Sequence, residues 1–167
     1  TNAYVHEART YVEKHFPSNP GMTDQFWYPV TYRAAQKNFD LFLRTRLKHF
    51  GTYQDAILAH ENVLFHSLLS PSLNIGLLTP EYVLKKTLAY AHDHKIAINN
   101  TEGFIRQIIG WREFVRGVYV QIGSHQKKSN FWQHTKKISA SWYDASTGIT
   151  PIDTTITKVL KTAYAHH

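Results

Sequence analysis

One apolar stripe constrains the fold more than any other feature of this sequence. Between residues 104 and 122, large apolar side chains recur every three or four positions, which is the spacing of one face of an α-helix. The stripe consists of Phe104, Ile108, Trp111, Val115, Val118 and Ile122. Asn99 and Glu102 have the spacing of a capping box before it, and Gly123 follows it as a stop signal. The pattern predicts a long amphipathic helix that packs one face against a core.

Similar spacing defines an amphipathic helix nearer the N-terminus. Thr31 is placed to cap this helix, and Gly51 follows its last apolar position as a stop signal. The expected core residues are Ala35, Phe39, Phe42, Leu43, Leu47 and Phe50. The same periodicity predicts a first helix over residues 2–16, which Pro17 would end.

Three prolines mark the starts of further helices. Ser70–Pro71, Thr79–Pro80 and Thr150–Pro151 each put a hydroxyl side chain before a proline, which is typical of a helix start. No stretch alternates apolar and polar residues between hairpin turns, the pattern that would indicate strands. We therefore predict an all-α domain of about six helices.

The composition sets limits on function without selecting one. The 167 residues suffice for one domain with a core, and the net charge of +7 suits a polyanionic partner as well as simple solubility. The sequence has no cysteine, which excludes disulfides and fits a reducing compartment. It shows neither a signal peptide nor a run long enough to span a membrane. We expect a monomeric cytoplasmic protein that makes no membrane contact.

Residues 64–78 form an apolar stretch that also carries polar side chains suited to a ligand. Ser70 is predicted as the N-cap and Pro71 as the first residue of a helix. A serine hydroxyl and unpaired backbone N–H groups would then meet at the positive end of the helix dipole, which favours phosphate. A capped core helix that binds nothing is the alternative, and the cap alone leaves both open.

Four blocks of sequence together resemble the photolyase/cryptochrome family, in its iron–sulfur bacterial branch. The block His66-Ser67-Leu68-Leu69-Ser70-Pro71 is similar to the segment that cradles the flavin diphosphate in this family. The other blocks are Phe50–Ala56, Glu102–Gln107 with Gly110–Phe114, and Tyr164-Ala165-His166-His167. The resemblance extends from about Phe26 to the end of the chain. It implies the helical FAD-binding domain of a light-driven flavoprotein that acts on UV-damaged DNA.

The resemblance also implies roles for individual residues. The residues implied to contact FAD are Tyr53, His66, Ser67, Leu68, Leu69, Ser70 and Phe104. A phenol buried in the core is the alternative for Tyr53. The residues implied to face DNA or the lesion are Gln107, Trp111 and Arg112, with Gly110 as one extra residue relative to the commoner spacing.

The implied catalytic residues are His166 and His167 at the end of the chain. The unperturbed pKa of a histidine lies near neutrality, so His166 suits proton donation to the hydroxyl that must move back between the two pyrimidines of a (6-4) photoproduct. His167 would stand beside the flavin or the lesion.

A basic stretch over residues 124–149 adds further candidates. Lys127 and Lys128 lie close in sequence to Phe131 and Trp132, and lysines beside aromatic rings suit backbone phosphates and stacked bases. Lysines in solvent above a packed aromatic edge are the alternative. We include Lys127 and Lys128 among the candidate DNA contacts.

Some features of the family are not expected within this chain. The sequence begins at Thr1 without a methionine and ends inside an apparent helix, so we interpret residues 1–167 as part of a helical FAD-binding domain. The antenna domain and the C-terminal remainder would lie outside it. The branch carries a four-iron four-sulfur cluster, but Pro151 occupies the first ligand position and no cysteine is present. We assign no metal ligand.

Three hypotheses for the function follow. The first is a (6-4) photolyase, a lyase in which photoexcited reduced FAD passes an electron to a pyrimidine lesion. The second is a cryptochrome that senses blue light without repair, and the third is a fragment that binds no flavin. His166 and His167 favour the first, because a sensor needs no acid beside a lesion.

Overall fold

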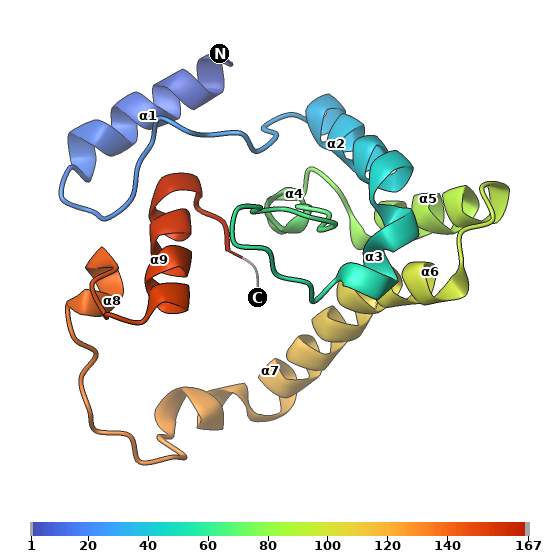
Figure 1. Ribbon diagram of the computed structural model, residues 1–167. Helices are drawn as coiled ribbons and strands as arrows, with labels where there is room; N and C mark the ends of the chain where they lie inside the picture. Colours follow the sequence, from blue (N-terminus) through green and yellow to red (C-terminus); the bar gives the residue numbers. More distant parts are fainter. Residues whose placement is uncertain (1, 166–167) are drawn as a thin grey trace. The chain divides into compact units, whose positions relative to one another are not determined.

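The computed structural model describes residues 2–165, and their regular elements are all helical, which confirms the predicted all-α class (Figure 1). Six of the described α-helices have eight residues or more. None of the described helices combines the length and the apolarity needed to cross a membrane. The α-helices are α1 (Ala3–His15), α2 (Tyr32–Thr45), α3 (Leu47–Tyr53), α4 (Ser70–Asn74), α5 (Pro80–Asp93), α6 (Ile98–Ile105), α7 (Trp111–Lys128), α8 (Ser141–Asp144) and α9 (Thr150–Thr162).

The described chain divides into two compact units. The first unit comprises residues 2–30, 57–63 and 136–165, and the second comprises residues 31–56 and 64–135. The larger core lies in the second unit, which holds α2 to α7.

The core of the second unit begins with α2 and α3. Thr31 caps α2 as predicted, because its Oγ1 accepts a hydrogen bond from the Ala34 N–H at 3.2 Å. All six core residues predicted for this stretch are buried. The prediction that Gly51 ends the helix is wrong, because the helix breaks earlier, at Arg46, and Gly51 lies inside α3.

Gly51 is required instead by the close approach of α3 to α6. A Cβ at Gly51 would lie 2.3 Å from the backbone oxygen of Asn99, so a larger residue cannot fit without movement of that backbone. The Gly51 N–H donates to Oδ1 of the buried Asn100 at 2.8 Å, which joins the two helices. The predicted capping box is wrong, because α6 begins at Ile98 without a side-chain cap and Asn99 lies within it.

Helix α5 is tied to α2 by an ion pair. Thr79 caps α5 as predicted, accepting from the Tyr82 N–H at 3.2 Å. Lys86 Nζ lies 2.5 Å from Oδ1 of Asp40 on α2. Burial alone would lower the pKa of Lys86, but hydrogen bonds to Asp40 and Tyr82 outweigh it, so the pKa is raised. Both side chains remain partly exposed, so the pair contributes modestly to stability.

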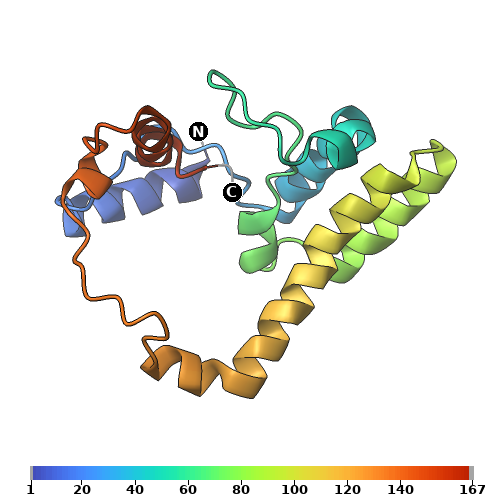
Figure 2. The ribbon, with the colours of Figure 1, turned by 60° about the horizontal axis from the view of Figure 1, so that its bottom comes forward.

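The long helix predicted around residues 104–122 contains a π-helical turn. This turn, η1 (Arg106–Gly110), separates α6 from α7, and α7 continues through Gly123 to Lys128, so the predicted stop at Gly123 is wrong. Figure 2 shows α6, η1 and the first part of α7 as one rod, beyond which α7 bends. A π-turn closes its hydrogen bond over i→i+5 and holds one residue more than an α-turn. Gly110, which the family resemblance predicts as an extra residue, is the last residue of this turn.

Only the beginning of the predicted apolar stripe is buried. Phe104 and Ile108 belong to the core, whereas Trp111, Val115 and Ile122 are exposed in the described chain. The prediction that this face packs against a core is therefore wrong beyond η1. The physical reason is that α7 extends past the helices that cover α6 and η1 (Figure 2).

The first unit joins the stretch 17–30 to α9. The Met22 N–H donates to the Leu160 carbonyl at 3.0 Å, and the Tyr28 hydroxyl donates to the Ala163 carbonyl at 3.2 Å. Burial raises the pKa of the Tyr28 phenol. The Trp27 and Tyr28 rings stack with their centroids 4.9 Å apart. The aromatic cluster of this stretch thus packs the unit together.

Helix α9 begins at Thr150 with Ile149 in the N-cap position, so Thr150 is not the cap. The Thr147 and Gly148 N–H groups donate to the Asp153 carboxylate at 2.9 and 3.0 Å, and the Thr147 hydroxyl donates to it at 2.6 Å. These bonds, led by that of the Thr147 side chain, lower the pKa of Asp153. The helix start is held by Asp153, one turn inside it.

Candidate functional site

The backbone of residues Ser67–Ser70, here called the amide cradle, suggests an anion-binding site in the second unit. Leu68 has a φ of +60°, in the left-handed region, and Leu69 follows with right-handed helical angles of −86° and −13°. Successive residues of opposite hand turn consecutive N–H groups toward one side, which is the geometry of anion-binding backbone nests. Among the described residues, no partner accepts a hydrogen bond from the N–H groups of residues 67–69. The cradle therefore offers unused donors to an anion.

The helix after the cradle differs from the prediction in its first residue. Ser70 is the first residue of α4, and Leu69 occupies the N-cap position without a side-chain hydrogen bond. The prediction of Ser70 as N-cap is wrong, because Leu69 is already in the right-handed helical region. Pro71 still lies in the first turn, where its missing N–H costs nothing. Ser72 adds a buried hydroxyl that has no partner among the described residues.

Gln54 joins the cradle region to two helices. His66 Nε2 lies 2.8 Å from the Gln54 carbonyl oxygen. Because that oxygen can only accept, Nε2–H donates, and this assigns Nδ1 of the neutral ring as the acceptor. The Gln107 Nε2 donates to Gln54 Oε1 at 3.3 Å. The end of α3, the start of the cradle and η1 thus converge at Gln54. Gln54 stands in one of the blocks that resemble the family, Phe50–Ala56, but no local pattern in the sequence predicts a role for it.

The two aromatic cofactor candidates occupy different environments. Tyr53 is 45% exposed and stacks on Phe65, with ring centroids 5.2 Å apart, so it is not a phenol buried in the core. Phe104 is 1% exposed and packs against Phe42 and Phe50, with centroids 4.7 and 5.3 Å away. Phe104 therefore has a packing role in this structure. Direct contact of either ring with a flavin stays a prediction.

The candidate DNA contacts are spread along η1 and α7. Gln107 lies in η1, Trp111 and Arg112 begin α7, and Lys127 and Lys128 end it. Trp111 is 56% exposed, whereas the Arg112 guanidinium turns back to the Ile108 carbonyl at 3.4 Å. At 1.5 Å per residue, a straight helix would separate the two ends of α7 by about 25 Å. The structure therefore brings Gln107 to the cradle region and leaves the lysines remote from it.

His166 and His167, the implied catalytic residues, lie outside the described residues. The described residues hold no group of three or more His, Cys, Asp or Glu side chains placed to bind a metal ion.

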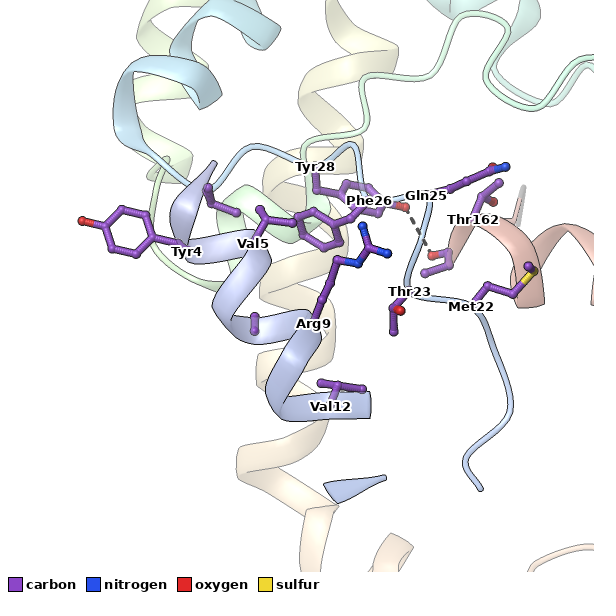
Figure 3. Close-up of a pocket in the computed structure, with 13 residues that line it drawn as sticks. Tyr4, Val5, Arg9, Val12, Met22, Thr23, Gln25, Phe26, Tyr28 and Thr162 are labelled. Atoms are coloured by element: carbon purple, nitrogen blue, oxygen red, sulfur yellow. Dashed lines mark hydrogen bonds between the residues drawn. The ribbon is translucent and has the colours of Figure 1, made fainter. Parts of the chain in front are cut away.

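A pocket in the first unit contains none of the predicted site residues. It encloses about 230 Å³ between α1, residues 22–30 and the end of α9, and its lining is mostly apolar (Figure 3). Arg9 points its guanidinium into the pocket beside Phe26, and the Tyr28–Ala163 hydrogen bond closes one side of it. The Arg9 Nε also lies 4.0 Å from Glu13. The cradle and the Gln54 junction, rather than this pocket, carry the polar groups that the sequence analysis singled out.

Comparison with known proteins links the chain to a DNA photolyase by sequence. It is 38% identical over 156 residues to a (6-4) photolyase of Agrobacterium fabrum, a match that covers 93% of this chain and 31% of that protein. It is 40% identical over 110 residues to an uncharacterized protein of Acanthamoeba polyphaga mimivirus, covering 65% of this chain and 84% of that protein. No family model matches. The chain thus spans about a third of the photolyase it resembles.

Proposed function

Because its sequence supports membership of the photolyase family, we propose that this chain forms part of the helical flavin-binding domain of a light-dependent DNA repair protein of the (6-4) type. The observation that carries the proposal is the 38% identity over 93% of the chain to a (6-4) photolyase. The proposal concerns a protein of which this chain matches one part. Its activity, its cofactor and its DNA substrate are therefore all part of the proposal.

The amide cradle fits the diphosphate of FAD. An anion at Ser67–Ser70 would accept hydrogen bonds from the backbone N–H groups that have no acceptor among the described residues. The left-handed conformation of Leu68 turns these N–H groups toward one side. The main chain supplies this charge complementarity without a cationic side chain. Backbone donors are fixed before the ligand arrives, so they do not pay the ordering entropy of a lysine or an arginine. We assign the cradle to the diphosphate and the neighbouring His66 and Tyr53 to the rest of the cofactor.

The cofactor, when bound in its reduced and photoexcited state, supplies the electron that the repair of a pyrimidine lesion needs. The residues of this chain orient the reacting groups. Gln54 fixes His66 through its carbonyl and Gln107 through its side chain, so both side chains are held before any ligand binds. A preorganised Gln107 amide suits a base edge, because it offers both a donor and an acceptor. We place Gln107, Trp111 and Arg112 on the lesion side of this site.

The iron–sulfur cluster of the branch is not part of the proposal. The 167 residues contain no cysteine, and Pro151 stands at the position implied for the first ligand. Thiolates hold such clusters, so the residues present do not fit one.

In this proposal His166 is the proton donor. An imidazolium beside the lesion would donate to the hydroxyl that returns between the two pyrimidines, and His167 would neighbour the flavin or the lesion.

The spread of cationic residues along α7 suits a duplex that runs along this helix. Because α7 bends, the span of about 25 Å for a straight helix is an upper bound, which corresponds to at most roughly seven base pairs at 3.4 Å per pair.

The test uses the protein as its complete gene encodes it, purified in the dark. We expect a flavin absorbance spectrum, and light-dependent loss of a (6-4) photoproduct from a synthetic oligonucleotide. The variant His166→Ala should keep the flavin and lose repair. Leu68→Pro, which removes one cradle N–H and also excludes the positive φ of Leu68, should weaken flavin retention, with Leu58→Pro in an exposed loop outside the cradle as a control for the proline itself.

The outcomes separate the three hypotheses. Flavin with no repair of either pyrimidine lesion would favour a blue-light sensor. A protein that retains no flavin after reconstitution with FAD would contradict the proposal. Equal flavin retention in the two proline variants would refute the role of the cradle.

A further inference from the structure

A closed turn follows α7 and presents two aromatic rings. We call Asn130–His134 the aromatic turn. The Asn130 Nδ2 donates to the His134 carbonyl at 2.8 Å, and the His134 N–H donates to Asn130 Oδ1 at 3.1 Å. The Gln133 N–H donates to the Asn130 carbonyl at 2.9 Å, and Gln133 has a φ of +52°. One asparagine thus closes the turn with three hydrogen bonds.

The two rings at the tip of the turn are both largely exposed to solvent. Phe131 is 80% exposed and Trp132 is 75% exposed. Their centroids lie 5.0 Å apart at an interplanar angle of 90°, so the edge of one ring meets a face of the other and each ring keeps at least one face open. Packing within the described unit does not explain two rings held in this way.

The charged side chains that flank the turn in the sequence are all positive. Between Glu113 and Asp144 the sequence contains no acidic residue. The basic residues of this interval are Arg116, Lys127, Lys128, Lys136 and Lys137. Lys127 and Lys128 end the helix that leads into the turn. A polyanion would therefore meet attraction along this stretch without any opposing carboxylate.

We propose that Phe131 and Trp132 form a stacking platform for unpaired bases of a nucleic acid whose phosphates pair with Lys127 and Lys128. Aromatic rings beside lysines bind such strands because every base has a π-face and every nucleotide carries a phosphate. The proposal deepens the DNA repair function proposed above and rests on it for the choice of DNA. An anionic membrane is the less suitable partner, because interfacial binding uses a continuous apolar face and the turn offers two rings among polar neighbours.

The test measures binding in the dark with undamaged DNA, so it requires neither flavin nor lesion. Fluorescence anisotropy of a labelled single-stranded oligothymidine reports the affinity of the purified chain. Phe131→Ala and Trp132→Ala should each weaken binding about fivefold or more, the loss of one stacked base. Tyr119→Ala, which removes a ring of α7 that is 76% exposed, should change binding less than twofold and serves as the matched control.

Salt dependence separates stacking from charge. The double variant Lys127→Gln/Lys128→Gln should reduce the slope of log affinity against log salt by about 1.4, whereas Trp132→Ala should leave the slope unchanged. Trp132→Phe should restore most of the affinity. Asn130→Ala keeps both rings and all charges but opens the turn, and it should also weaken binding.

Three results would overturn the proposal: unchanged binding by the Phe131→Ala/Trp132→Ala double variant, an equal loss in Tyr119→Ala, or binding to anionic phospholipid vesicles without binding to the oligonucleotide. Loss of photorepair with intact stacking would contradict the function proposed above and leave the platform standing.

Discussion

Replacement of Gly51 by alanine tests the packing that positions the candidate site. The added Cβ would lie 2.3 Å from the Asn99 backbone oxygen and 2.9 Å from the Asn100 backbone nitrogen, so α3 and α6 must move apart. Gln54 follows Gly51 by three residues, and Gln107 lies two residues beyond α6, in η1. A shift between these helices therefore disturbs the hydrogen bond between the two glutamine side chains.

The expected change in the free energy of unfolding combines two destabilising contributions and one stabilising contribution. Forcing a methyl group into a close-packed contact costs about 1–3 kcal/mol. Loss of the hydrogen bond from Gly51 leaves the buried Oδ1 of Asn100 unsatisfied and costs about 1–3 kcal/mol more. Alanine in place of glycine inside a helix returns about 1 kcal/mol. We expect Gly51→Ala to lower the free energy of unfolding by about 3 kcal/mol.

Urea denaturation followed by far-ultraviolet circular dichroism measures this difference, with two other glycines as controls. A Cβ at Gly103 would meet its nearest atom at 3.5 Å, an ordinary contact, and one at Gly117 would meet none within 4 Å. Both lie inside helices, so Gly103→Ala and Gly117→Ala should raise stability by up to about 1 kcal/mol. If Gly51→Ala stays within about 0.5 kcal/mol of the native protein, the close approach does not constrain residue 51 and the reasoning is refuted.

Further predictions concern charges and the π-turn. The pKa of Lys86 is raised in the folded state, so the stability that its pair with Asp40 adds is complete below the unfolded pKa and is lost as the pH rises through the folded value. Lys86→Met should therefore cost about 0.5 kcal/mol at neutral pH and nothing in strong alkali, as measured by thermal unfolding across pH. The pKa of Asp153 is lowered, so its contribution is present above the unfolded pKa and is lost as the pH falls through the folded value. Asp153→Asn should destabilise the protein at neutral pH and match the native melting temperature in acid; a constant difference would contradict this. Deletion of Gly110 should convert η1 to an α-turn, keep the helix content seen by circular dichroism, and shift the fluorescence of Trp111; an unchanged spectrum with unchanged DNA affinity would refute a role for the extra residue.

Local signals in the sequence predicted the helices and much of the core. Thr31 and Thr79 cap the helices that they were expected to cap, because an N-cap depends on a side chain and the turn that follows it. The buried stripe from Ala35 to Phe50 was also visible, because helical spacing survives even where the helix breaks at Arg46. Each of these features depends only on residues that are close together in the sequence.

Contacts between distant residues could not be read from local patterns. Gly51 looks like a helix stop in the sequence, yet its role depends on Asn99 and Asn100, almost fifty residues away. Gln54 gains its place at the site only when η1 brings Gln107 to it. The left-handed Leu68 was equally hidden, since leucine rarely adopts a positive φ and nothing in its neighbours announces one.

The π-turn shows how one residue changes what a helix presents. Each residue of an α-helix turns the next side chain by about 100°, so one inserted residue rotates everything after it by that angle unless a wider turn absorbs it. At η1 the helix continues without a break: Ile108 stays in the core before Gly110, and α7 begins at Trp111. The i→i+5 turn also frees the backbone from strict α-helical pairing, which is common where a helix meets a functional site. Gln107 lies inside this turn and reaches Gln54 from it. The π-turn therefore holds Gln107 where its side chain reaches Gln54, and Trp111 begins α7 directly after the same turn.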